Sequence, residues 1–154
     1  VPAFYLPALL GSENDIERFS KTGERRDLNR EKFDFDKLII KLEDKNSIAS
    51  KNLKILSSAM KIRSKIKSFH PSAEMKCLTK GRSDIVAIHR TFEKSSIFAL
   101  HNMTDNKLNF SIDDNLKSSL GNVFIYCDYL SGRQYSNLNF VLDPFQVLWI
   151  GKYK

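Results

Sequence analysis

The side chains best suited to ligand chemistry gather in one polar stretch, residues 11–30. It contains Asn14 and Asp15 and, further along the chain, the adjacent arginines Arg25 and Arg26. A guanidinium is a rigid, always charged fork that suits hydroxyl groups and carboxylates, and its charge also favours phosphate. Two structural interpretations stay open. Arg26 and Arg30 pair with Asp27, Glu24 or Glu31 to hold the loop, and Asn14 and Asp15 cap turns.

An apolar run, residues 1–6 (VPAFYL), precedes this polar stretch. Its composition predicts a fully buried strand, which needs neighbouring strands on both sides and cover on both faces. A buried strand that leads into a long loop rich in Arg, Asp and Asn is how a barrel enzyme builds one wall of its active site. The run therefore predicts the end of a larger structure.

Three segments carry a resemblance to a known family. Residues 1–5 (VPAFY) resemble the eighth-strand motif of the α-amylase superfamily. Residues 10–15 (LGSEND) and 22–30 (TGERRDLNR) are more specific and resemble the sucrose phosphorylase branch of glycoside hydrolase family 13. The remaining sequence, as far as residues 144–149 (PFQVLW), is compatible with the C-terminal part of such a chain.

The resemblance implies a role in carbohydrate metabolism. Enzymes similar to this branch cleave an α-glucoside, of the sucrose or glucosylglycerate type, with inorganic phosphate and release α-glucose 1-phosphate. A covalent glucosyl-enzyme forms on a carboxylate, and the configuration at the sugar carbon is retained. Phosphate is a substrate in this chemistry, and the resemblance implies no cofactor and no metal.

The same resemblance implies roles for three residues. Arg26, which stands before the run Asp-Leu-Asn-Arg, would help to bind the glucosyl unit. Asn14 and Asp15 would line the acceptor side, at the C-terminal face of the barrel. The catalytic carboxylates would lie on earlier barrel strands, upstream of Val1, so no residue here is assigned as catalytic. The chain is expected to be inactive by itself, and its expected partner is the missing N-terminal barrel segment.

Two helices are predicted after the loop. Asp34 or Asp36 would cap a helix over residues 33–43, and Ser47 would cap a longer helix that runs to about Lys67. The apolar residues of the longer helix cover about half of its circumference, which is wide for a helix packed on one partner. The pattern therefore predicts a helix held between two partners.

Past Pro71 the pattern changes to the alternation of apolar and polar residues that is typical of strands. Strands are expected over residues 74–79, 84–92, 96–103, 107–112, 122–130 and 145–151. A series of strands without helices between them favours an antiparallel sandwich. The expected fold is therefore α+β: residues 1–70 are the last strand, loop and helices of a (β/α)8 barrel, and residues 71–154 are a small antiparallel all-β domain, a Greek-key sandwich.

The net charge of +7 raises the alternative of a basic module that binds nucleic acid. The lysines of the longer helix, however, fall on one arc opposite its apolar residues, which is typical of a solvated face, and no nucleic-acid motif accompanies them. No apolar run approaches the roughly 20 residues of a membrane span. Neither nucleic acid nor a membrane is therefore expected as a partner.

The sequence does not support metal or redox chemistry. The three histidines, His70, His89 and His101, are scattered along the chain, and structural roles are expected for them. Cys77 and Cys127 lie in strand-like runs and belong to no Cys-x-x-Cys pair. We expect two buried thiols in a reducing, cytoplasmic environment, with a disulfide between them as the alternative.

A further alternative belongs to another class of function. The chain would then be a catalytically inactive remnant of a truncated or split gene, acting only as a structural partner of a second chain. Its uncovered first strand and helix would be liable to aggregate unless that partner covered them.

Overall fold

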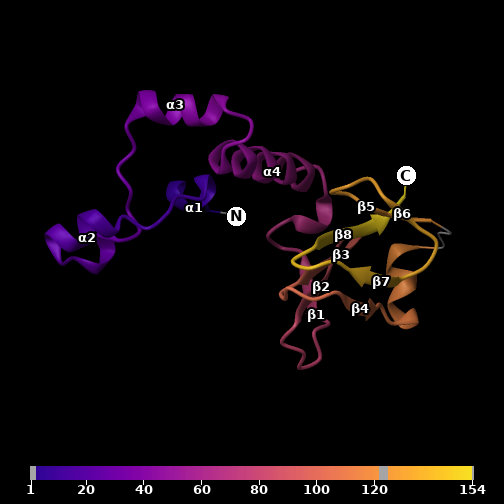
Figure 1. Cartoon of the computed structure of the whole chain (residues 1–154). Coiled ribbons are helices and arrows are strands. Elements are labelled where there is room, and N and C mark those ends of the chain that lie inside the picture. Colours follow the sequence, from indigo (N-terminus) through magenta and orange to yellow (C-terminus); the bar gives the residue numbers. More distant parts are fainter. Residues whose placement is uncertain (1–2, 122–124, 154) are drawn as a thin grey trace. The chain divides into compact units, whose positions relative to one another are not determined.

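The computed structural model describes residues 3–121 and 125–153. The chain divides into two compact units, Val1–Lys61 and Ile62–Lys154, and Figure 1 shows their elements in chain order. Val1 and Pro2, which begin the first predicted strand, and residues 122–124, which begin another, lie outside the described residues. In the described part of the chain, no helix is long and apolar enough to cross a membrane.

The first unit is helical. Its elements are α1 (Leu6–Leu10), α2 (Ile16–Thr22), the 3-10 helix η1 (Arg25–Asp27), α3 (Phe35–Glu43) and most of α4 (Ile48–Arg63). Its described residues include only two buried apolar side chains, Leu10 and Ala49. The helices of this unit therefore owe their starts and ends to local signals more than to a shared core.

The capping signals of the two predicted helices are confirmed. Asp34 Oδ1 accepts a hydrogen bond from the Lys37 amide at 3.1 Å and starts α3. Ser47 Oγ accepts one from the Ser50 amide, also at 3.1 Å, before the first turn of α4. α4 is shorter than predicted, because it ends at Arg63 and the chain is extended at Ile66.

The predicted strand over residues 1–6 is wrong for the described residues. Residues 3–5 have no regular structure, Leu6 begins α1, and the side chains of Phe4 and Tyr5 are about half exposed. A buried strand needs neighbouring strands, and the described residues of the first unit contain none. Local signals decide instead: a proline lies in the first turn of α1, and Gly11 ends it at φ +64°.

The second unit contains two antiparallel sheets and is the predicted all-β part of the chain. A six-stranded sheet has the order β1-β2-β3-β8-β5-β6, and a two-stranded sheet pairs β4 with β7. The strands are β1 (Glu74–Cys77), β2 (Ile85–Phe92), β3 (Ser95–Asn102), β4 (Leu108–Ser111), β5 (Tyr126–Asp128), β6 (Gln134–Tyr135), β7 (Asn139–Leu142) and β8 (Val147–Lys152). Two 3-10 helices, η2 (Lys67–Phe69) and η3 (Asp114–Leu120), complete the unit.

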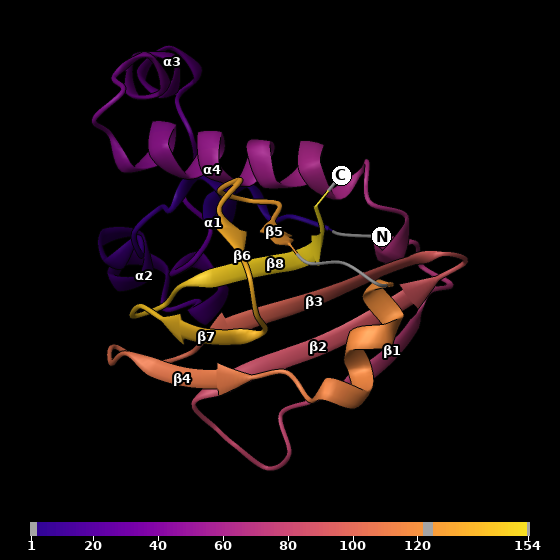
Figure 2. The same cartoon turned by 90° about the vertical axis from the view of Figure 1, so that its right-hand side faces the viewer.

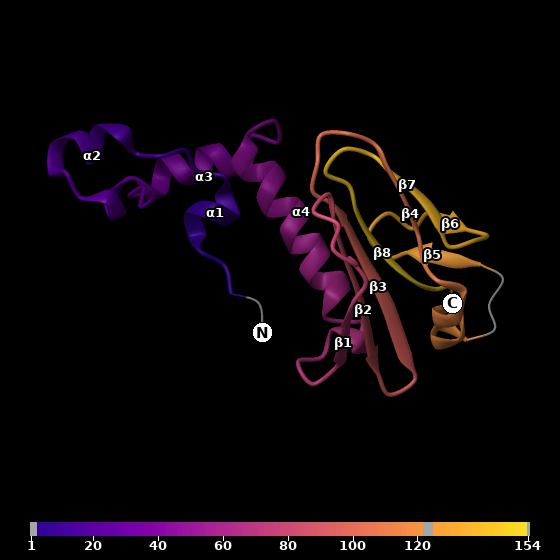
Figure 3. The same ribbon diagram turned by 90° about the horizontal axis from the view of Figure 1, so that it is seen from below.

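The core of this unit lies between its two sheets. Figures 2 and 3 show the β4–β7 pair lying over one face of the larger sheet. Phe98 and Ile150 of the larger sheet and Phe110, Phe140 and Leu142 of the smaller one are buried in one cluster. On the opposite face, the ring of Phe69 lies 4.8 Å from that of Trp149. Full burial of each such side chain contributes roughly 1.5–3 kcal/mol, so this core stabilises the second unit.

The sequence pattern located most strands of the second unit and missed four elements, β6, β7, η2 and η3. Strands β6 and β7 were not predicted, because one is only two residues long and the other alternates over only four. The helix η3 was not predicted either. The prediction of two buried thiols is wrong for Cys77, which is exposed, and correct for Cys127; both cysteines are free. Strand β1 is an edge strand with all four residues exposed, which explains the error at Cys77.

His89 has the structural role expected from the sequence. Its ring stacks on Phe98 with the centroids 4.3 Å apart, and its Nε2 lies 2.8 Å from Ser96 Oγ and 3.1 Å from Ser119 Oγ. The cluster therefore joins β2, β3 and η3. Burial lowers the pKa of His89, and the charge of Lys76 lowers it further. Burial also lowers the pKa of His101.

Asp128 is the most strongly bonded buried acid of the second unit. It is 1% exposed and lies at the end of β5. Its carboxylate accepts hydrogen bonds from the amides of Leu130, Ser131 and Trp149 and from the Ser131 hydroxyl. One side chain thus fixes both the turn after β5 and the neighbouring strand β8.

We predict that the second unit loses stability in mild acid. The folded-state pKa values of His89 and His101 lie below their ordinary 6.5, so the unfolded chain binds these protons first as the pH falls. The unfolding free energy should therefore decrease as the pH drops through 6.5. Urea unfolding at pH 7.5 and 5.5, followed by the fluorescence of Trp149, the chain's one tryptophan, measures this. His101→Gln should reduce the difference between the two pH values, and an unchanged difference would contradict the assignment.

We also predict that Asp128→Ala lowers the unfolding free energy by about 3 kcal/mol, because several buried donors lose their acceptor. The same urea titration at pH 7.5 measures the loss. Asp143→Ala is the matched control: its carboxylate forms an exposed ion pair with Lys107, at 3.1 Å, and its loss should cost less than about 1 kcal/mol. Equal losses in the two variants would show that Asp128 does not hold the turn.

Candidate functional site

The polar stretch singled out from the sequence forms a loop closed by its own backbone. The Asp15 amide donates to the Leu28 carbonyl oxygen at 2.7 Å, so the two ends of the segment between them meet. Asp15 Oδ1 also accepts from the Arg18 amide at 2.9 Å and thereby caps α2. The capping interpretation of Asp15 is therefore what the structure shows for its carboxylate.

An ion pair inside this loop was not predicted from the sequence. Arg18 Nη2 lies 2.9 Å from Asp27 Oδ1, and Arg18 Nη1 donates to the Arg30 carbonyl oxygen at 3.3 Å. Asp27 is 9% exposed, so Arg18 compensates a nearly buried charge. The two residues lie on α2 and η1, and no helical or strand spacing relates them, so only the folded loop reveals the pair.

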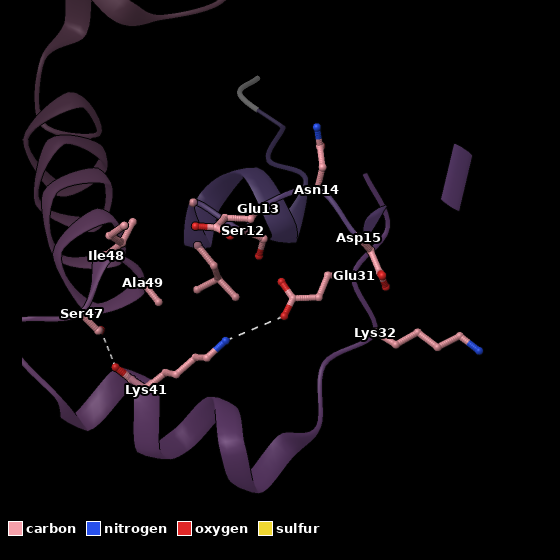
Figure 4. A pocket seen from close by; sticks show the side chains of 12 residues that line it. Ser12, Glu13, Asn14, Asp15, Glu31, Lys32, Lys41, Ser47, Ile48 and Ala49 are labelled. Carbon is pink, nitrogen blue, oxygen red and sulfur yellow. Dashed lines mark hydrogen bonds and ion pairs between the residues drawn. The ribbon is translucent and has the colours of Figure 1, made fainter. Parts of the chain in front are cut away.

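A hollow of about 570 Å3 lies beside the loop, between α1, the start of α4 and the residues that precede and follow α3. Asn14 and Asp15 are part of its wall. Figure 4 shows the carboxylate of Glu31 and the ammonium of Lys41 approaching each other, 3.9 Å apart, whereas the side chains of Asn14 and Lys32 point away. The hollow therefore presents a positively charged hydrogen-bond donor, Lys41, and a negatively charged acceptor, Glu31. The backbone of residues 11–15 adds further polar groups.

The structure separates Arg26 from this hollow. Arg26 lies on η1, is exposed and is not part of the lining. Within the described ranges, nothing forms a hydrogen bond or an ion pair with its guanidinium, because Asp27, the acid next to it, is bound by Arg18. Asn14 and Asp15 thus both belong to the wall of the hollow, whereas Arg26 does not, and its guanidinium charge is free for another contact.

The acidic side chains of this region form no metal-binding cluster in the described part of the chain. Within residues 3–121 and 125–153, no cluster of three or more His, Cys, Asp or Glu side chains is placed to hold a metal ion. Three acids in or next to the loop have structural partners: Asp15 caps α2, Asp27 pairs with Arg18, and Glu31 pairs with Lys41. The carboxylates of Glu13 and Glu24 form no hydrogen bond or ion pair with a described residue. The arrangement suits the binding and orientation of a polar ligand.

Comparison with curated proteins confirms the resemblance to the sucrose phosphorylase branch of glycoside hydrolase family 13. The chain is 29% identical to the glucosylglycerate phosphorylase of Allomeiothermus silvanus over 97% of its own length and 24% of that protein. It is 26% identical to the glucosylglycerate phosphorylase of Escherichia coli, over 97% of this chain and 25% of that protein. The chain thus spans about a quarter of the length of these relatives. No protein-family model matches the chain.

Solved structures show a similar fold at low sequence identity. AmyP, solved in complex with maltose, superposes with a TM-score of 0.58 at 13% identity, covering 68% of this chain and 21% of that one. An Anoxybacillus alpha-amylase superposes with a TM-score of 0.56 at 15% identity, covering 68% of this chain and 23% of that one. The trehalulose synthase MutB of Pseudomonas mesoacidophila superposes with a TM-score of 0.53 at 12% identity, covering 73% of this chain and 19% of that one. These likenesses concern the fold alone.

We predict that Arg18→Ala opens the loop, because it leaves Asp27 nearly buried without a partner. Hydrogen exchange at the Asp15 amide, which closes the loop, should become roughly tenfold faster, as measured by NMR. Lys21→Ala on the same helix is the control: the Lys21–Glu17 pair is mostly exposed, with side chains 71% and 81% accessible, and its removal should leave this amide unchanged. Equal exchange in both variants would contradict the role given to Arg18.

Proposed function

We propose that the chain forms the C-terminal part of a retaining glycoside phosphorylase that acts on an α-glucoside of the glucosylglycerate type. The reaction would use inorganic phosphate and release α-glucose 1-phosphate. The observation that carries this proposal is a match that runs along almost the whole chain, over 97% of its length, to relatives that are glucosylglycerate phosphorylases. The amylase-like fold of the solved neighbours supports the same assignment.

The proposed mechanism needs carboxylates that this chain is not proposed to supply. A retaining enzyme uses one carboxylate as the nucleophile and a second as the acid and base, about 5–5.5 Å apart across the glycosidic bond. Asp15 and Asp27 are engaged in a cap and in an ion pair, which supports leaving these two carboxylates out of this role. We therefore expect the chain alone to be inactive and the catalytic pair to lie in the other three quarters of the enzyme.

The surface of the first unit supports a partner of this kind. Its exposed large apolar residues include Phe35, Ile40, Ile48 and Ile55, each more than 60% exposed. An apolar surface of this extent, in a unit with so little core of its own, is typical of an interface. In the proposed enzyme, residues 1–70 close the catalytic barrel and the remaining barrel segment covers these side chains, while residues 71–154 form the C-terminal domain.

Arg26 is the proposed contact to the glucosyl unit. Its exposed guanidinium has no partner in the described structure, so it is available to donate to sugar hydroxyls or to a phosphate oxygen. Asn14 and Asp15, on the wall of the hollow, are proposed to line the acceptor side. The Asp15 cap would then hold the loop in place while the outward-pointing Asn14 contacts the acceptor.

A chimera tests both the function and the assignment of Arg26. The matching quarter of the Escherichia coli relative would be replaced by this chain, and the release of α-glucose 1-phosphate from glucosylglycerate and phosphate would be measured. We expect activity in the chimera and a loss of about a hundredfold or more in kcat/KM for Arg26→Ala, because a charged donor to the glucosyl unit is removed.

Arg25→Ala is the matched control, since Arg25 lies next to Arg26 on η1 and carries the same charge. It should retain most of the activity. A folded chimera without phosphorolysis would overturn the proposed function. An active chimera in which Arg26→Ala has no effect would overturn only the role of Arg26, and a reversed order of the two variants would move that role to Arg25.

A further inference from the structure

A second hollow, of about 800 Å3, lies wholly within the second unit. It is formed by the connection between β1 and β2, the end of β4 with the first turns of η3, and the residues that lead into β7. Its floor is apolar and belongs to the core, since Leu78, Phe110 and Leu138 are all buried. Its rim is polar. An open hollow with an apolar floor and convergent polar groups is the usual form of a small-molecule site.

The rim carries more donors than the protein itself uses. The ammonium groups of Lys76 and Lys80 form no ion pair or hydrogen bond with any described residue, and the same holds for the side chains of Ser111 and Asn139. The other charges of the rim are neutralised or engaged: Arg82 pairs with Asp84, Lys117 pairs with Asp114, and Asp113 caps η3. The positive charges of Lys76 and Lys80, the negative charge of Asp113 and several neutral polar groups therefore remain on the rim, which has a net positive charge.

The strand register places Lys76 on the face of the larger sheet that η3 covers. Lys76 of β1 lies opposite His89 of β2, and His89 is bonded to Ser119 of η3. Residues opposite each other in an antiparallel pair point to the same face of the sheet. Lys76 therefore stands on the face that η3 covers, which is the face where the hollow opens.

We propose that this hollow binds a phosphorylated sugar. A phosphate monoester carries close to two negative charges at neutral pH, which matches the two unpaired lysines. The hydroxyl and amide groups of Ser111 and Asn139 suit sugar hydroxyls, and the apolar floor suits the C–H face of the ring. The inference does not depend on the proposed function, because every lining residue belongs to the second unit and none belongs to the loop of residues 11–30.

NMR of the whole 15N-labelled chain tests the proposal with three probes: α-glucose 1-phosphate, glucose and inorganic phosphate. We expect α-glucose 1-phosphate to shift amide signals of residues 76–82, 110–117 and 137–139, and to bind at least about tenfold more tightly than either component. Equal affinity for phosphate would show a simple anion site. Equal affinity for glucose and for α-glucose 1-phosphate would show that the phosphate group contributes nothing to binding. Either result, or shifts located elsewhere, would overturn the proposal.

A double variant and the ring of His89 make the test specific. Lys76→Gln combined with Lys80→Gln should weaken binding about tenfold or more, whereas Lys51→Gln combined with Lys54→Gln, on the exposed face of α4, should not. The groups that face His89 are Lys76, Ser96 and Ser119, of which only Lys76 is charged. A bound phosphate should therefore raise the pKa of His89, and glucose should not. An unchanged His89 pKa at saturation would place the phosphate away from Lys76.

Discussion

Strand β3 is the element on which the second unit depends. It is hydrogen-bonded to β2 on one side and to β8 on the other, and its residues Ile97–Leu100 are all buried. Alternate side chains of β3 therefore contribute to both faces of the sheet. Burial on this scale offsets the conformational entropy lost when the surrounding strands are ordered. The polar clusters of His89 and Asp128 then attach η3 and the β5–β6 turn to this framework.

The first unit has no comparable element. Helices α1 to α3 have at most nine residues, and isolated helices of such length are marginal in water, so they depend on cover from elsewhere. Caps at Asp15, Asp34 and Ser47 determine where helices start, but they do not supply a core. The exposed apolar side chains of α3 and α4 are the surface on which that cover would lie. This difference between the two units follows directly from how much apolar area each of them buries.

The two candidate binding regions differ for the same reason. The loop with Asn14, Asp15 and Arg26 lies on the unit with little core. It is held by the hydrogen bond of the Asp15 amide, by the nearly buried Arg18–Asp27 pair and by the bonds of Arg18 and Tyr5 to the carbonyl oxygens of Arg30 and Asn29. A catalytic barrel needs its ligand contacts held to within a fraction of an ångström, so in the proposed enzyme this loop would gain its precision from the remaining barrel segment. The hollow beside η3 stands on strands and is already supported by the sandwich core.

The sequence by itself determined the features that depend on short-range patterns. Alternation in β2 and β3, the caps at Asp34 and Ser47, and the change of pattern at Pro71 are all local, and the structure contains the corresponding elements. The motif around Arg26 likewise located the polar loop. Tertiary structure alone decided the Arg18–Asp27 pair and the exposure of Cys77 on an edge strand. It also decided that residues 3–6 form no strand, because a buried strand is stable only where neighbouring strands pair with its backbone and its faces are covered.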